Sequence, residues 1–303
     1  MQISIKQIIF SIKRKIVTVS LLLGSVTDLQ PAHCGRHVIV GSHGGFATGV
    51  YASDRGVASL ICHDAGIGLT EAGVQALALL DRTAIPAVAV GHMSARIGDP
   101  ADMLERGRVT RLNGVAQRLG VEPGMSVQAV HKVFCKLAVT TTVAEAHRES
   151  RGAFLRYAVV PVDRQVSFRC RVVALDSASS VASDDEGSII VTGSHGGLPG
   201  NTATKAMRVR PLLAVFNDAG IGIDEAGVRR LAVLDDQNIA ASCVHAGSAR
   251  IGDARSTYAT GVISTANRCA LRLGAAPGMT IADLVEVTVG RPGKTMQTTF
   301  LEQ

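Results

Sequence analysis

A serine next to a histidine, flanked by glycines, occurs twice in this chain of 303 residues. The motif Gly-Ser-His-Gly-Gly places Ser42 beside His43 and Ser194 beside His195. Glycines let the backbone turn sharply, and the N–H groups exposed in such a turn can hold an anion or oxyanion. The serines are candidate nucleophiles or donors, and the histidines candidate general bases, acids or metal ligands. The alternative is a tight structural turn whose serine and histidine bond to the backbone.

A second repeated motif, Asp-Ala-Gly-Ile-Gly, begins with Asp64 and again with Asp218. A carboxylate in this position could orient the histidine, bind a metal or act as a base, or it could cap the next helix. A helix N-terminus after a glycine turn also suits a carboxylate or phosphate. The glycine spacing departs from the Gly-x-Gly-x-x-Gly dinucleotide pattern, so the sequence requires no nucleotide cofactor.

The third motif, Ser-Ala-Arg-Ile-Gly-Asp, is repeated without change. It supplies Arg96 with Asp99, and Arg250 with Asp253. Arginine suits bidentate binding of a carboxylate or phosphate, so these four residues are candidate substrate-binding residues. An internal Arg–Asp ion pair that holds the loop is the alternative.

Two asparagines complete the candidate site. Asn113 and Asn267 each follow the motif's aspartate by 14 residues. We expect them to support the site through hydrogen bonds, and the alternative is an asparagine that faces solvent.

The two copies also differ next to the second motif, where Cys62-His63 in one copy becomes Phe216-Asn217 in the other. Cys62 could be a thiolate nucleophile or a buried thiol at the end of a strand. The difference allows the two halves to have different roles. His43, His63, His92 and His245 could help to hold a divalent metal together with the aspartates, but none of the spacings is diagnostic of one.

The composition limits the classes of partner. Hydrophobic residues make up 47% and charged residues 18%, which is typical of a globular chain. The net charge of +6 is spread out, and aromatic residues are only 3%, which argues against stacking on nucleic acid. A small anionic molecule fits this charge balance. The sequence leaves homo-oligomerisation open.

The cysteines and the N-terminus bear on the location of the protein. The six cysteines include no Cys-x-x-Cys pair, and we interpret them as reduced thiols. We therefore expect a cytoplasmic protein. Lys13-Arg14-Lys15 followed by Ile16–Leu23 has the look of a signal peptide. Because a similar apolar run recurs at Val172–Leu175, we interpret both runs as strands, and no run is long enough to cross a membrane.

Equivalent motifs lie 152 to 154 positions apart, which indicates an internal duplication. We predict two repeats, 15–138 and 168–290, joined by a connector at 139–167. An N-terminal extension at 1–14 and a C-terminal tail at 291–303 complete the chain. Within each repeat, short apolar runs alternate with helical patterns, predicted at 71–81 and 101–119 and again at 225–235 and 255–273. This alternation predicts an α/β fold with two similar open, mostly parallel sheets that have helices on both faces.

The three motifs follow predicted strands, and ligands of open α/β sheets bind at the carboxyl ends of strands. We therefore expect an enzyme that acts on a small carboxylate-bearing anion, and specifically a hydrolase. Ser42, His43 and Asp64, with Ser194, His195 and Asp218, would be catalytic. The alternatives are a non-catalytic protein that binds a small ligand between two similar domains, and an oligomeric scaffold.

Overall fold

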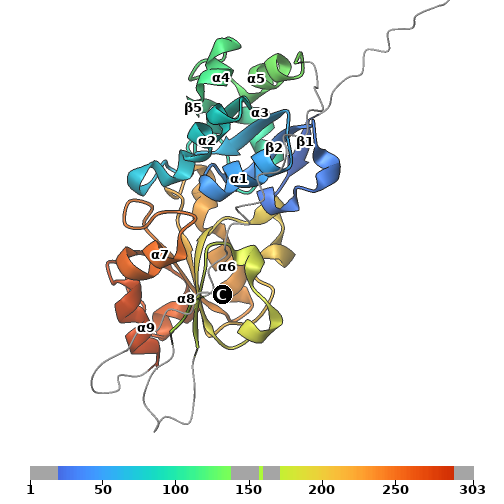
Figure 1. Cartoon of the computed structure of the whole chain (residues 1–303). Coiled ribbons are helices and arrows are strands. Elements are labelled where there is room, and N and C mark those ends of the chain that lie inside the picture. Colours follow the sequence, from blue (N-terminus) through green and yellow to red (C-terminus); the bar gives the residue numbers. More distant parts are fainter. Residues whose placement is uncertain (1–19, 138–156, 160–170, 290–303) are drawn as a thin grey trace, which may run out of the picture.

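The structure is a computed structural model that describes residues 20–137, 157–159 and 171–289. It has two halves, each built around one β-sheet, as the duplicated motifs predict (Figure 1). The predicted N-terminal extension, the C-terminal tail and nearly all of the connector lie outside the described residues.

The first sheet has five strands in the order β1-β2-β3-β4-β5, with β1 to β4 parallel and β5 antiparallel to β4. Its strands are β1 (Leu21–Leu23), β2 (His37–His43), β3 (Ser59–His63), β4 (Ala87–Val90) and β5 (Val109–Leu112). The helices of this half are α1 (Phe46–Asp54), α2 (Ala76–Arg82), α3 (Pro100–Arg106), α4 (Gly114–Arg118) and α5 (Val127–Phe134).

The second sheet has six strands in the order β11-β10-β9-β8-β7-β6, and its two edge strands are antiparallel to the parallel centre. Its strands are β6 (Tyr157–Val159), β7 (Val172–Leu175), β8 (Ile189–His195), β9 (Leu213–Asn217), β10 (Ala240–Val244) and β11 (Ile263–Ala266). The helices are α6 (Arg229–Asp236), α7 (Ala254–Thr260), α8 (Arg268–Arg272) and α9 (Ile281–Val289). Strand β6 lies in the segment predicted as connector, so part of that segment belongs to this sheet.

Short 3-10 helices join these elements. They are η1 (Val26–Asp28), η2 (Pro31–His33), η3 (Leu69–Val74), η4 (Ala178–Ser180), η5 (Ser183–Asp185), η6 (Pro199–Asn201), η7 (Ala203–Lys205) and η8 (Ile223–Val228). The halves differ after the Gly-Ser-His-Gly-Gly motif, where α1 in the first half is replaced by η6 and η7 in the second.

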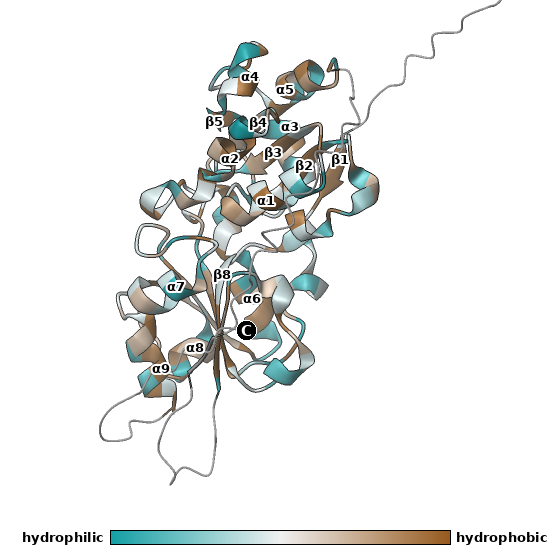
Figure 2. Ribbon diagram, viewed as in Figure 1, coloured by the Kyte–Doolittle hydropathy of each residue, from teal (hydrophilic) through white to brown (hydrophobic). Residues whose placement is uncertain are grey.

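Both faces of each sheet are packed. Along β2, Val38 and Val40 join one apolar cluster and Ile39 joins another, because successive side chains of a strand point to opposite faces. The strands lie at the apolar centre of each half (Figure 2). This double burial explains why the strands read as short continuous apolar runs.

The predicted helices at 71–81 and 225–235 begin later than expected, at Ala76 and Arg229. The residues before them form the 3-10 helices η3 and η8, which contain left-handed φ angles of 53° at Thr70 and 56° at Asp224. A left-handed residue cannot continue a right-handed helix, so the regular helix starts beyond it.

The predicted long helices at 101–119 and 255–273 are wrong in a different way. Each is a short helix, an antiparallel edge strand and a second short helix. In the first half, Gly107 follows the end of α3 and β-branched Val109 and Thr110 enter β5, a composition that favours a strand.

The halves meet at the carboxyl ends of their parallel strands. The Leu69 N–H donates to the Ala246 carbonyl at 2.9 Å, and the Ile223 N–H donates to the His92 carbonyl at 2.8 Å. These are equivalent bonds in opposite directions, which is the pattern of a two-fold interface. An apolar cluster built from the repeated motifs fills this interface, namely Ala65, Ala72, Ile97, Ala219, Ala226 and Ile251.

Within the described ranges, none of the helices combines the length and the apolar character needed to cross a lipid bilayer.

Candidate functional site

The serines of the two Gly-Ser-His-Gly-Gly motifs hold neighbouring loops. The Ser42 hydroxyl accepts a hydrogen bond from the Val26 N–H at 2.9 Å, and the Ser194 hydroxyl accepts one from the Ala178 N–H at 2.8 Å. A serine hydroxyl that accepts such a bond keeps its own hydrogen to donate. Both serines can therefore still bond to a ligand.

The histidines of these motifs are fixed as donors. His43 Nδ1 accepts the Gly45 N–H, and His195 Nδ1 accepts the Gly197 N–H, each at 3.1 Å. In a neutral imidazole whose Nδ1 accepts, the proton sits on Nε2. Each ring therefore presents an N–H group, so in this state it can polarise an anion or carbonyl but cannot take a proton.

The local electrostatics keep both rings neutral. Burial, reinforced by His63, lowers the pKa of His43 from 6.5 to about 4. Burial lowers the pKa of His195 well below 6.5, and the nearby Arg230 guanidinium and His43 lower it further. A neutral donor is thus the stable form of both rings at neutral pH.

A pocket of about 250 Å³ opens between the halves and is lined by Ser42 and His43 from one half and by Ser194 and His195 from the other. The structure thus brings together four of the six predicted catalytic residues, whose catalytic role stays a prediction. The other predicted site residues do not line this pocket, namely Asp64, Arg96, Asp99, Asn113, Asp218, Arg250, Asp253 and Asn267.

Arg230 is a pocket residue that the sequence analysis missed. Its side chain is 2% exposed, its Nε and Nη2 donate to the Gly197 carbonyl at 3.1 and 2.8 Å, and its Cζ lies 4.5 Å from the centre of the Phe216 ring. Burial lowers its pKa to about 10, which leaves it charged at neutral pH. The described residues place no carboxylate within 4 Å of this guanidinium.

A comparison of the two copies could have revealed Arg230. The Arg230 N–H donates to the Gly196 carbonyl as the Ala76 N–H donates to that of Gly44, so arginine in one copy stands where the other has alanine. The same comparison pairs Phe216 with Cys62. The arginine and the phenylalanine that it stacks on are therefore both specific to the second half.

The aspartates of the second motif hold their own loops. Asp64 accepts from the Gly66 and His92 N–H groups, the His92 ring and the Thr110 hydroxyl, all between 2.9 and 3.1 Å. Asp218 accepts the Gly220 N–H at 3.0 Å and the equivalent N–H at Ala246 at 2.9 Å. Neither aspartate forms a hydrogen bond or ion pair with His43 or His195, and both fix the turn that brings the halves together.

The two copies differ at Cys62-His63 and Phe216-Asn217, but the second residue of each pair has the same structural role. His63 accepts the Ala65 N–H and bonds the Ala95 carbonyl, and Asn217 makes the same two bonds with Ala219 and Ala249. Histidine and asparagine therefore play the same part. Burial raises the pKa of the Cys62 thiol to about 12, so the thiol stays protonated at neutral pH.

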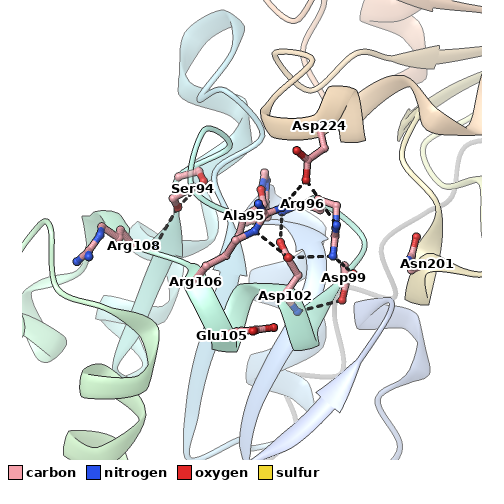
Figure 3. Close-up of polar contacts among 12 residues, drawn as sticks. Ser94, Ala95, Arg96, Asp99, Asp102, Glu105, Arg106, Arg108, Asn201 and Asp224 are labelled. Carbon is pink, nitrogen blue, oxygen red and sulfur yellow. Dashed lines mark hydrogen bonds and ion pairs between the residues drawn. The ribbon is translucent and has the colours of Figure 1, made fainter.

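Arg96 lies in an ion-pair network rather than in the pocket (Figure 3). Its Nη2 is 2.9 Å from Asp102 and 3.3 Å from Asp99, and its Nη1 is 3.5 Å from Asp224 of the second half. Arg106 also pairs with Asp224, at 2.7 Å, and this bond lowers the pKa of the carboxyl. The geometry of Arg96 is the ion pair that the sequence analysis gave as its alternative.

Arg250 lacks this network because its surroundings differ. Ser256 stands where the first half has Asp102, and its hydroxyl accepts the Arg250 N–H at 2.9 Å. Asp253 accepts the Ser256 N–H and caps α7, as Asp99 caps α3. These two aspartates therefore start helices.

The two asparagines lie at the opposite ends of the strands from the pocket. The Asn113 side chain accepts from the Ala87 and Ala116 N–H groups and donates to the Ile85 carbonyl, so it caps α4 and fixes the start of β4. Asn267 makes the equivalent bonds in the second half. The structure does not bring these asparagines to the candidate site.

The described residues contain no group of three His, Cys, Asp or Glu side chains that could hold a metal ion. His63 and His92 instead bond to a carbonyl and to Asp64.

Comparisons of the chain with protein-family models, with curated proteins and with solved structures found no match.

Proposed function

We propose that this protein binds a small carboxylate-bearing molecule in the pocket between its halves. The observation that carries the proposal is the charge of Arg230, which is buried on the pocket wall without a carboxylate partner among the described residues. A buried charge is costly unless it is paired, and an anion in the pocket would pair it. Arg208 adds positive charge to the same pocket, whereas Lys205, which also lines it, is paired with Asp28 at 4.0 Å.

The motif side chains suit the same ligand. The Nε2–H groups of His43 and His195 and the hydroxyls of Ser42 and Ser194 are donors, which an anion requires. The cavity has the volume of about eight water molecules, so it suits a ligand of roughly ten non-hydrogen atoms. We further propose a cytoplasmic setting, on the ground of the free cysteines.

The test compares Arg230→Met with Arg229→Met, which changes an exposed arginine on the same helix. Acetate, propanoate and malonate serve as probes in calorimetry and thermal melting at pH 7. We expect at least one to bind the wild type and Arg229→Met alike. Its affinity for Arg230→Met should fall about tenfold or more, because a hydrogen bond to a charged group contributes about 1.5–3 kcal/mol. Equal binding by both variants, or no binding to the wild type, would contradict the proposal.

Hydrolysis of such a molecule is the second candidate, favoured by the two serine hydroxyls in the same pocket. In that reaction the histidine N–H groups would stabilise an oxyanion rather than remove a proton. His43→Ala and His195→Ala would lower turnover of an identified substrate, while unchanged turnover in both would exclude this role.

A further inference from the structure

The pocket wall carries negative as well as positive charge. Asp176 follows β7 and lines the pocket, with one carboxylate oxygen accepting the Ala254 N–H at 2.9 Å. No cation of the described chain pairs with Asp176. Burial raises the pKa of this carboxyl, and the neighbouring carboxylate of Asp253 raises it further. A cation beside Asp176 would therefore stabilise its ionised form.

Asp176 and Arg230 stand on either side of the second Ser-His motif. Strand β8, which ends in the motif, lies between β7 and β9 in the sheet. Asp176 directly follows β7, and Arg230 lies in α6, which comes after β9 in the chain. Neighbouring strands lie about 4.8 Å apart, so β7 and β9 are separated by roughly 10 Å. No ion pair joins the two side chains, and each is left to bond a ligand.

Both charges belong to the second copy alone. Ser25 and Ser177 cap equivalent 3-10 helices, so Gly24 in the first half stands where the second has Asp176. Ala76 likewise stands where the second half has Arg230. The duplication thus supplies the donors twice, and the second half adds Asp176 and Arg230, two pocket-lining charges of opposite sign.

We propose that the ligand is a small zwitterion of the amino acid class, with its carboxylate at Arg230 and the motif donors and its ammonium at Asp176. This inference rests on the proposed function, because it takes the pocket to bind a carboxylate. An ammonium group supplies the N–H donors that the free oxygen of Asp176 accepts, and the two ends of one ligand then neutralise both unpaired charges.

The experiment uses pairs of compounds that differ by one amino group. Calorimetry at pH 7 compares L-alanine with propanoate and γ-aminobutanoate with butanoate, on the full chain. The wild type should bind an amino compound about tenfold more tightly than its partner or better. Asp176→Asn, which keeps the acceptor for Ala254, should lose that preference but keep the affinity for the plain carboxylate. Asp236→Asn, a surface change of equal charge, should match the wild type.

The results separate this inference from the proposed function. Equal binding of amino compounds and plain carboxylates by the wild type would overturn the zwitterion proposal and leave the carboxylate site in place. The same conclusion would follow if Asp176→Asn kept the preference for amino compounds over plain carboxylates. If none of the four compounds binds the wild type, the carboxylate site and the zwitterion fall together. The preference of the wild type is measured without any variant, so a failure of Asp176→Asn to fold does not remove the test.

Discussion

The histidines of the repeated motif illustrate how one backbone bond decides what a side chain can do. Because Nδ1 of His43 accepts the N–H two residues ahead, its proton is confined to Nε2. The motif Gly-Ser-His-Gly-Gly is compatible with a base, an acid or a donor. The turn geometry selects the donor, and this selection cannot be read from the residue types alone.

The low pKa of His43 predicts a loss of stability in acid. Its pKa is about 4 in the folded chain against 6.5 for an unperturbed histidine, so between these values the unfolded chain binds a proton that the folded chain does not. The free energy of unfolding should be unaffected by this group above pH 6.5. It should fall between pH 6.5 and pH 4 by up to about 3 kcal/mol, at 1.36 kcal/mol per pKa unit.

Urea denaturation of His43→Asn across this range tests the prediction. Asparagine can keep the bond to Gly45, as Asn217 does where the other half has His63. The variant should show a shallower loss of stability in acid than the wild type. His245→Asn is the matched control, because His245 makes the same local bond to Gly247 but is exposed. Superimposable pH profiles for His43→Asn and the wild type would refute the assignment.

The place of Arg230 in the pocket could not be predicted from the sequence for a related reason. Two consecutive arginines at the start of a helix are ordinary in a sequence, and only the fold shows that Arg229 is exposed while Arg230 is buried over Phe216 beside the pocket. Arg96 was singled out because it is repeated, yet its contacts are with Asp99, Asp102 and Asp224. Repetition marked the residues that shape the interface as well as those that line the pocket.

At the scale of elements, the apolar runs of the sequence correctly predicted the central strands, whereas the helical patterns predicted the helices only in part. Val38–Val40 and Ala87–Val90 lie in strands buried on both faces, where a continuous apolar run is required. The helix bound failed at Glu71, whose left-handed φ of 55° belongs to a turn in which the neighbouring Leu69 N–H bonds the Ala246 carbonyl of the other half. The strand at 109–112 was missed because it is short and pairs antiparallel at an edge.

Asn113 should be important for stability and unimportant for binding. Its side chain caps α4 and bonds the backbone at both Ile85 and Ala87, so Asn113→Ala leaves buried backbone groups without partners. We expect a loss of about 1–3 kcal/mol in the free energy of unfolding, measured by urea denaturation, with propanoate affinity unchanged. Gln117→Ala, on the exposed side of the same helix, is the control and should be close to neutral. A loss of affinity without a loss of stability would instead place Asn113 at the binding site.

At the scale of the whole molecule, the duplication and the pocket are linked through the interface. The halves face each other with the carboxyl ends of their strands, so loops that bind ligands in open sheets here also bind each other. The Asp-Ala-Gly-Ile-Gly loops form the contact, and the Gly-Ser-His-Gly-Gly loops line the space beside it. The sequence predicted that the three motifs converge at this edge, but it could not apportion them between contact and pocket.

The contact between Gly66 and Gly220 is the point at which this linkage can be broken. Gly66 has a φ of +69°, and a methyl group there would lie 2.9 Å from the Gly220 Cα of the other half. Gly66→Ala therefore adds a backbone clash between the halves to the strain of a left-handed alanine, which is about 1–2 kcal/mol. Gly124, with a φ of +86° and open space around it, isolates the strain alone when changed to alanine.

We expect Gly66→Ala to be less stable than Gly124→Ala by about 1–3 kcal/mol, the usual cost of overpacking, as measured by urea denaturation. Because both halves line the pocket, a displaced interface should also weaken propanoate binding in Gly66→Ala, whereas Gly124→Ala should bind as the wild type does. If the two variants are equally stable and bind equally well, the close approach of the two glycines does not hold the halves in register. Lower stability with unchanged binding would mean that the pocket tolerates movement between the halves.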